Sequence, residues 1–227
     1  MSTEQTASTD TGGAASARVA AYLRAAILGG ELRPGDRIRQ EDIAEKFGAS
    51  RLPVREALRM LEAEGLTEHE PNKGARVPRL TRHEVEVIYR MRERLEPLAL
   101  AESLPQLSTA DHEQLEEVQQ RIEANDDLEK FLDLDREFHM LTYSGCGIDP
   151  LNSMVTRLWN STQHYRRSYV ELGGHSRMWV VNSEHRLILD AVVRRDAIDA
   201  ERFVEGHIRR TRIELGQHPE VFDEQGP

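Results

Sequence analysis

The sequence predicts a mainly helical protein in two parts: an N-terminal unit that combines helices with short strands, and a longer unit made only of helices. Three observations support this. Apolar residues recur at helical spacing along most of the 227 residues. Short extended segments bounded by turn residues occur only before residue 81. Residues 1–80 hold 12 Lys+Arg and 12 Asp+Glu, whereas residues 81–227 hold 18 and 28, so the acidic excess belongs to the second part.

Composition narrows the class of protein. A chain of 227 residues is long enough for two domains of ordinary size, and 38% hydrophobic with 31% charged residues is typical of a soluble globular protein. No apolar run approaches the roughly 20 residues that span a bilayer, which speaks against a membrane partner. Residues 1–15 are polar, lack a signal peptide and predict a disordered leader. The single Cys146 excludes an internal disulfide and fits a cytoplasmic location.

The N-terminal unit begins with a helix and a short strand. The first predicted helix covers about 17–28, where apolar residues follow helical spacing, and it ends at Gly29. A turn over 32–35 leads into the strand. A second, shorter helix covers 40–47, and Gly48 opens a tight turn after it.

Residues 50–66 predict a third helix with two different faces. Ser50 suits its N-cap, Pro53 falls in the first turn, where a missing backbone N–H costs nothing, and Gly65 marks the stop. One face is apolar and anchors the helix: Val54, Ala57, Leu58 and Leu61. The other carries three arginines at four-residue spacing, which can reach a nucleic-acid groove together: Arg51, Arg55 and Arg59.

The remaining elements complete a known architecture. Two helices joined by a short Gly-containing turn form a helix-turn-helix, and a turn over 71–74 between two extended segments forms a hairpin, or wing, behind it. Residues 16–80 are therefore predicted to be a winged helix-turn-helix domain. Arg59 lies close to Glu62 and fits a solvated surface position as well as it fits a DNA contact.

From residue 81 onward the sequence predicts helices and no strand. Short links with turn residues separate the helices, which favours an antiparallel bundle over 81–217, followed by a tail over 218–227. The predicted helices cover 82–104, 109–124, 127–144, 149–171, 176–194 and 197–215.

One group of residues in this bundle has the chemistry of a metal site. Asp135 and His139 are four residues apart and project from one helix face, a spacing that offers two ligands to one ion. His185 and His207 each lie within a later predicted helix. One carboxylate and three imidazoles suit a borderline divalent ion, zinc foremost, with nickel or manganese as alternatives. Because an Asp/His pair at this spacing is common, the spacing alone is weak evidence.

The run LRPGDRIRQEDIAEKFGASRLPVREALRMLEAEGL resembles the DNA-binding domain of the GntR family of bacterial transcription regulators, and the likeness extends over residues 16–80. The motifs LRPG, PVREAL and EAEGL occur together at the spacing of that family. Family members contact DNA through the helix start and the wing tip, which implies contacts from Ser50, Arg51, Arg55, Lys73 and Gly74. Leu52 stands where the family often has Thr, and Glu41 where some members have a DNA-contacting Arg, so those two contacts are expected to be absent.

Two later segments, DREFHMLTYSGCG and SEHRLILDAVVRRDAIDAERFVEGH, resemble the FCD effector domain of the FadR subfamily, over about residues 82–215. Six helices are similar to its VanR-type branch. Metal-binding members hold the ion with an Asp and a His one turn apart and two later His, which implies the ligand set Asp135, His139, His185 and His207. The resemblance also implies an effector-binding and dimerisation role for this domain.

An open position on the ion suggests what the effector is. Four protein ligands leave room on an ion that accepts five or six, and a small carboxylate can complete the shell while an arginine clamps its far end. Arg92 is the first candidate for the clamp because it matches the family's Arg ahead of a Leu-Glu pair, although an ion pair with Glu96 is an equal alternative. Weaker candidates are Arg90, Arg157 and His164.

These features together predict a regulator rather than an enzyme. The expected protein is a homodimeric repressor on a two-fold symmetric double-stranded DNA operator, whose affinity changes when the bundle binds a small carboxylate. In one alternative the metal itself is the signal. In a less favoured one the bundle is a metalloenzyme with Glu184 as general base, but no nucleophile or oxyanion motif accompanies the site.

Overall fold

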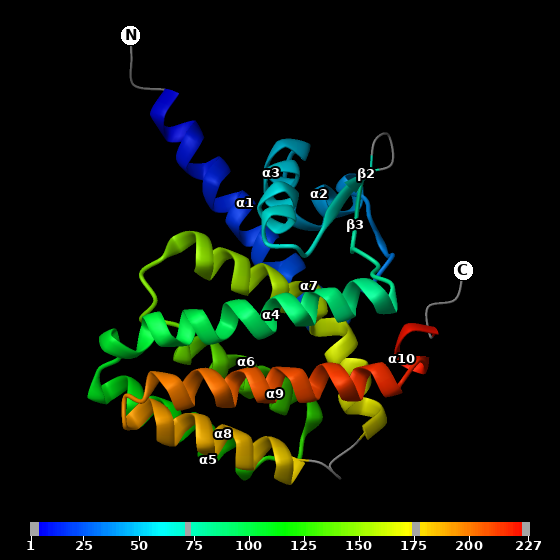
Figure 1. Ribbon diagram of the computed structural model, residues 1–227. Coiled ribbons are helices and arrows are strands. Elements are labelled where there is room, and N and C mark those ends of the chain that lie inside the picture. The colour runs from blue at the N-terminus through cyan, green and yellow to red at the C-terminus, as the bar shows by residue number, and fades with distance from the viewer. Residues whose placement is uncertain (1–4, 71–73, 174–177, 224–227) are drawn as a thin grey trace. The chain divides into compact units, whose positions relative to one another are not determined.

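The computed structural model of the protein describes residues 5–70, 74–173 and 178–223 (Figure 1). The chain divides into two compact units, Met1–Leu80 and Thr81–Pro227. The described residues are mainly helical, and their strands form one small antiparallel sheet within the first unit. The predicted fold class is therefore confirmed.

The first unit is a winged helix-turn-helix, as predicted. The three strands are antiparallel in the order β1-β3-β2, with Glu68 opposite Arg76 and Glu70 opposite Gly74 in the hairpin. Its core lies between α1, α3 and the sheet, where Leu23 and Leu61 are fully buried. The elements are α1 (Gln5–Leu28), β1 (Arg37–Ile38), α2 (Gln40–Phe47), α3 (Arg51–Ala63), β2 (Glu68–Glu70) and β3 (Gly74–Arg76).

Helix α3 has the two predicted faces. The apolar residues of its anchoring face are all buried, and all three arginines of the other face are exposed. Ser50 has the extended backbone of an N-cap, but its hydroxyl makes no capping hydrogen bond, so only part of that expectation is met. After the helix, Gly65 has a φ of 77°, a conformation that favours glycine and turns the chain toward β2.

Helix α1 is longer than the sequence suggested. It begins at Gln5 and therefore includes most of residues 1–15, which were expected to form a disordered leader. Two physical reasons account for the difference. Ala14 and Ala15 are strong helix formers, and extending an existing helix costs less than starting one. Near its middle, the Ser16 hydroxyl donates to Glu56 on α3 (2.8 Å) and ties the helix to the domain.

The second unit consists of helices close to the six predicted ranges. Helix α4 packs along α9 and also contacts α7, while α8 lies against α9 and α5 (Figure 1). Thr81 and Ser108 start their helices with capping boxes. The expected tail contains one further turn of helix. The elements are α4 (Arg82–Ser103), the 3₁₀ turn η1 (Leu104–Gln106), α5 (Thr109–Glu123), α6 (Leu128–Thr142), α7 (Asp149–Gly173), α8 (Met178–Val193), α9 (Ala197–Gln217) and α10 (Glu220–Asp223).

Candidate functional site

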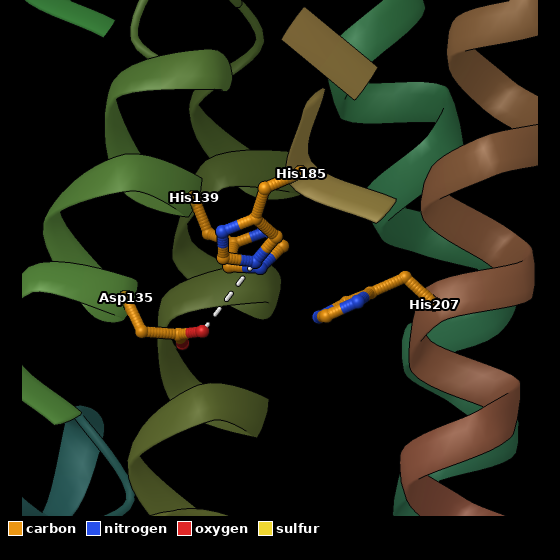
Figure 2. A group of neighbouring side chains, drawn as sticks. All are labelled: Asp135, His139, His185 and His207. Carbon is orange, nitrogen blue, oxygen red and sulfur yellow. Dashed lines mark ion pairs between the residues drawn. The ribbon is translucent and has the colours of Figure 1, made fainter. Parts of the chain in front are cut away.

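Three helices bring the four expected metal ligands together. Asp135 and His139 come from α6, His185 from α8 and His207 from α9, and all four side chains are buried and face a common centre (Figure 2). One ligand atom from each lies within 4.8 Å of the others. With metal–ligand bonds near 2.1 Å, the ligand atoms of one tetrahedral ion lie about 3.4 Å apart, so modest side-chain movements would close the group around one ion.

Helix α6 owes its position to a strongly amphipathic sequence. Asp127 caps its N-terminus by accepting a hydrogen bond from the backbone N–H of Lys130 (2.9 Å). Apolar residues on the same stripe as the two ligands, Phe131 and Phe138 among them, fill the bundle core. The Phe138 ring also stacks on the imidazole of His185, with ring centroids 4.4 Å apart, which fixes the plane of that ligand.

Hydrogen bonds outside the centre fix the tautomers of two histidines. His185 Nδ1 lies 2.9 Å from the amide oxygen of Gln119, whose amide nitrogen donates to Glu123 (3.1 Å) and thereby sets the amide's orientation. His207 Nδ1 lies 3.0 Å from a carboxylate oxygen of Glu184. Both Nδ1 atoms therefore donate a proton, and in the neutral imidazole this tautomer leaves the lone pair that a metal requires on Nε2.

The third histidine is fixed through a tyrosine. Tyr143 donates to the buried carboxylate of Glu96 (2.7 Å), so its hydroxyl oxygen is free to accept from His139 Nδ1 at 3.4 Å. Glu96 is held in turn by Trp159 Nε1 (2.9 Å) and by Arg92 Nε (2.5 Å). His139 thus also presents Nε2 inward, supported by a chain of buried hydrogen bonds.

Three atoms at the centre are buried without any hydrogen-bond partner among the described residues. They are Asp135 Oδ1, His139 Nε2 and His185 Nε2. Leaving a buried polar atom unpaired costs on the order of 1–3 kcal/mol, so native proteins do so rarely and usually for a reason. A carboxylate oxygen and imidazole lone pairs converging on one point satisfy the donor set of a divalent cation, and such an ion would remove all three penalties.

The protonation states agree with a metal site. Burial alone would raise the pKa of Asp135, but the charge of Arg166 and its hydrogen bond to the carboxylate hold that pKa well below its usual range. Burial lowers the pKa of His139 well below its normal value, and burial together with His207 lowers that of His185 to about 3. At neutral pH the carboxylate is therefore charged and these imidazoles are neutral, which are the forms that bind metal.

Arg166, on α7, is one of the residues around this centre that sequence reasoning missed. It forms an ion pair with Asp135 Oδ2, and the two side chains are only 8% and 0% exposed. Because Oδ2 is held in this way, Oδ1 is left to face His185 Nε2 at 3.5 Å. No local pattern links Arg166 to Asp135, 31 residues earlier in the chain. The available signal was its place on the buried stripe of α7 that carries Trp159, seven residues before it.

The four expected effector residues are not brought together. Arg92 is buried and donates to Glu96 and to Thr162 (3.0 Å), so it forms the ion pair that was its alternative role. Through Glu96 it still belongs to the chain of hydrogen bonds that leads to Tyr143 and His139. Arg90 is exposed and pairs with Glu86 one turn away, and Arg157 is exposed as well. Neither lies at the buried centre. His164 is half-buried on α7, and its ring lies nearly perpendicular to the ring of Tyr165.

The expected DNA-contacting residues of α3 and its N-cap are all open to solvent. Ser50 and the three arginines of α3 are exposed, and Gly74 opens β3 with a φ of 87°. Lys73 lies outside the described residues. Arg55 and Arg59 line a hollow between α3 and the hairpin together with Glu62, the residue that made Arg59 ambiguous. At the start of α3, Arg51 forms an ion pair with Glu41 of α2 (3.2 Å).

The geometry weakens the metalloenzyme alternative. Glu184, the only base proposed for it, accepts hydrogen bonds from His207 Nδ1 and from Arg210 Nε (2.6 Å). A carboxylate engaged with the outer nitrogen of a ligand orients that ligand and is not positioned to take a proton from water at the centre.

Comparison with protein families gives two matches that together span most of the chain. The family described as "Bacterial regulatory proteins, gntR family" matches residues 15–77, and the FCD domain matches residues 87–210. No helix among the described residues has both the length and the apolar character needed to cross a membrane.

Individual relatives agree with the family matches. An HTH-type transcriptional regulator of Bacillus subtilis, YdhC, is 31% identical over 82% of this chain and 84% of its own. The Escherichia coli transcriptional repressor GlaR is 26% identical over 82% of this chain and 89% of its own. Among solved structures, E. coli McbR/YncC superimposes with a TM-score of 0.77 at 24% identity, covering 90% of this chain and 98% of its own, which supports the fold.

Proposed function

Because the chain belongs to the GntR family of bacterial regulatory proteins and carries an FCD domain, it is a DNA-binding transcription regulator, and we propose that it is a metal-dependent repressor that responds to a small carboxylate. The α3 face would read the operator, and the buried Asp/His centre would hold a divalent ion that the carboxylate completes. The single observation that carries the metal is the convergence of unpaired buried ligand atoms at the centre.

The proposed DNA contacts follow from the surface of α3. Arg51 and Arg55 would read base edges, for which guanine is the natural partner because it offers two acceptors to one guanidinium group. Ser50, Lys73 and Gly74 would contact the backbone or the minor groove, and Arg59 is assigned to the phosphates. The first unit carries no net charge, so binding depends on this local basic face and not on the overall field of the protein.

A homodimer fits both the operator and the surface of the second unit. One recognition helix reads only a short half-site, and a two-fold symmetric operator presents two of them. On α4, three exposed apolar side chains lie along one face at spacings of four and seven residues: Val87, Met91 and Leu98. We assign this face to contact with a second copy of the chain. We also propose that the protein represses transcription, as the name of the related repressor GlaR suggests.

Zinc is the proposed ion, with nickel and manganese as alternatives. Three imidazoles and one carboxylate match the ligand preferences of zinc, and an ion that expands beyond four ligands would have a further position for an effector. A carboxylate effector would bind at such a position through the charge of the ion, because buried Arg92 and Arg166 are already paired with Glu96 and Asp135.

The test begins with metal content. Protein stripped by a chelator and reloaded with zinc should contain about one ion per chain by elemental analysis. The double variant His185→Ala/His207→Ala should contain none, whereas the control His69→Ala/His83→Ala, which removes two exposed histidines, should load normally. Unchanged metal in the first variant refutes the ligand set.

The second step tests whether the signal is the carboxylate or the metal ion itself. Operator affinity is measured on zinc-loaded protein with a panel of small carboxylates, and on stripped protein titrated with zinc alone. A change of affinity that requires both zinc and one acid supports the proposal. A full response to zinc alone supports the alternative in which the metal is the signal.

A further inference from the structure

An acidic residue lies directly beside the first proposed DNA-reading arginine. Glu41 is in the first turn of α2, Arg51 is the first residue of α3, and Arg51 Nη2 lies 3.2 Å from Glu41 Oε1. The two side chains are 71% (Arg51) and 60% (Glu41) exposed. Because the pair is open to solvent, DNA that docks on α3 meets Arg51 and Glu41 together.

The ion pair leaves most of the arginine available. A guanidinium group carries five N–H donors, and the contact with Glu41 occupies one nitrogen. Guanine needs two donors, for O6 and N7. A free arginine loses considerable rotamer entropy when it is fixed on a base, whereas an arginine already held by a carboxylate has lost part of it beforehand. Glu41 therefore prepares Arg51 for bidentate contact with a base edge.

The same carboxylate acts against contacts with phosphate alone. Glu41 and Asp42 both lie in the first turn of α2, and the first helix of a helix-turn-helix crosses the DNA backbone. A negative charge there is repelled by phosphates, whereas a neutral base edge carries no such penalty. Repulsion of this kind weakens binding to any sequence, and the guanine contact restores affinity only where the correct base is present.

We propose that Glu41 is a specificity-determining residue, which orients Arg51 toward guanine and penalises binding to non-operator DNA. The proposal rests on the proposed role of α3 as the DNA-reading helix. It assigns Glu41 a function at a position where the sequence alone indicated only a missing contact.

The experiment uses the full chain and a randomised DNA library, from which the wild type, Glu41→Gln and Glu45→Gln select their preferred sites. Glu45 is the matched control, since it is exposed on the same helix one turn further on and makes no ion pair within the described part of the chain. For Glu41→Gln we expect tighter binding to random DNA and a ratio of operator to random affinity that falls about fivefold or more, with weaker selection of one guanine in each half-site. Glu45→Gln should leave the ratio within about twofold.

A double-mutant experiment tests whether Glu41 acts through Arg51. In the Arg51→Ala background the guanine preference should already be lost, and adding Glu41→Gln should not weaken base selection further. Equal effects of the two glutamine variants, or a further loss of selection in the Arg51→Ala background, would overturn the inference. If the wild type itself selects no motif, the DNA-reading role of α3 fails instead, which is a different result from a clear wild-type motif left unchanged by Glu41→Gln.

Discussion

The two units use the same chemical pair, an arginine with a carboxylate, in opposite ways. In the first unit Arg51 and Glu41 are mostly exposed, and their nitrogen and oxygen atoms lie 3.2 Å apart. In the second unit Arg92 and Glu96 are 4% and 0% exposed, at 2.5 Å. Water reaches the first pair and is excluded from the second, so the donors of Arg51 that Glu41 does not use stay open to DNA, while Arg92 and Glu96 are held in the core.

This difference shows where each unit holds polar groups that lack a full set of partners. The proposed DNA-binding face of α3 keeps its charges in water, where an open donor costs little and remains available to a large ligand. The bundle keeps unpaired atoms in a dry interior, where each is expensive and persists only because surrounding hydrogen bonds hold it in place. The first arrangement suits a surface that reads DNA, and the second suits a centre that captures an ion.

The largest expected effect comes from breaking the buried pair. Arg92→Ala leaves the Glu96 carboxylate without its cation in the core, and such a change costs about 3–5 kcal/mol of unfolding free energy. Arg90→Ala removes the same side chain two residues away on α4, where the pair with Glu86 is exposed, and should cost about 0.5 kcal/mol or less. Urea denaturation followed by circular dichroism, with a chelator present to exclude metal effects, measures both.

Equal losses in these two variants would contradict the comparison itself. They would mean that water reaches the Arg92–Glu96 pair, or that the exposed Arg90 carries packing energy through its aliphatic stem. A small loss for Arg92→Ala would also remove the support inferred here for Tyr143 and His139.

An intermediate effect is expected at the residues that surround the proposed metal centre. Gln119→Leu keeps the side-chain volume but removes the acceptor for His185 Nδ1, so the imidazole loses the bond that fixes its tautomer and orientation. Zinc affinity, measured by competition with a chelator of known affinity, should fall about 10- to 100-fold. The control is Gln120→Leu, the exposed neighbour that bonds to Glu116, and it should bind zinc like the wild type. An undiminished affinity in Gln119→Leu would show that the hydrogen bond to Gln119 does not support zinc binding by His185.

Local patterns in the sequence were sufficient for most of the fold. Helical periodicity and the turn residues between helices located the helices of the bundle, and the Pro53 and Gly65 signals located α3. The start of α1 was predicted too late in the chain. Residues 1–15 are polar and contain glycine, which suggested disorder, but such a composition does not prevent an existing helix from extending into them. The irregular turn at Gly145 could not be derived either. It depends on a close approach to Ser103, whose carbonyl oxygen would lie 2.6 Å from a Cβ at Gly145.

The candidate site was predictable only in part, for a similar reason. Asp135 and His139 share a helix face, so their spacing carried information, and a family resemblance supplied His185 and His207. The supporting residues come from helices distant in the chain: Arg166 pairs with a residue 31 positions earlier and Gln119 with one 66 positions later. Periodicity shows which face of a helix is buried, but it does not show which residues of another helix contact that face. The supporting hydrogen bonds could therefore be identified only from the structure.

The smallest expected effect on the fold belongs to the exposed face of α3. Arg55→Ala removes a solvent-exposed side chain with no ion pair within the described residues, so the unfolding free energy should change by no more than about 0.5 kcal/mol. Operator affinity should nevertheless fall by about 1–3 kcal/mol for each protomer in a gel shift at fixed salt, because one bidentate base contact is lost. Arg59→Ala is the internal comparison. If Arg59 contacts a phosphate, the variant should bind all DNA sequences more weakly by the same factor, and its affinity should depend less on salt. If Arg59 is a solvated partner of Glu62, neither the affinity nor its salt dependence should change. Normal operator affinity in Arg55→Ala would remove that residue from the reading surface. Lost stability would mean that α3 uses its exposed charges for packing, as the bundle uses its buried ones.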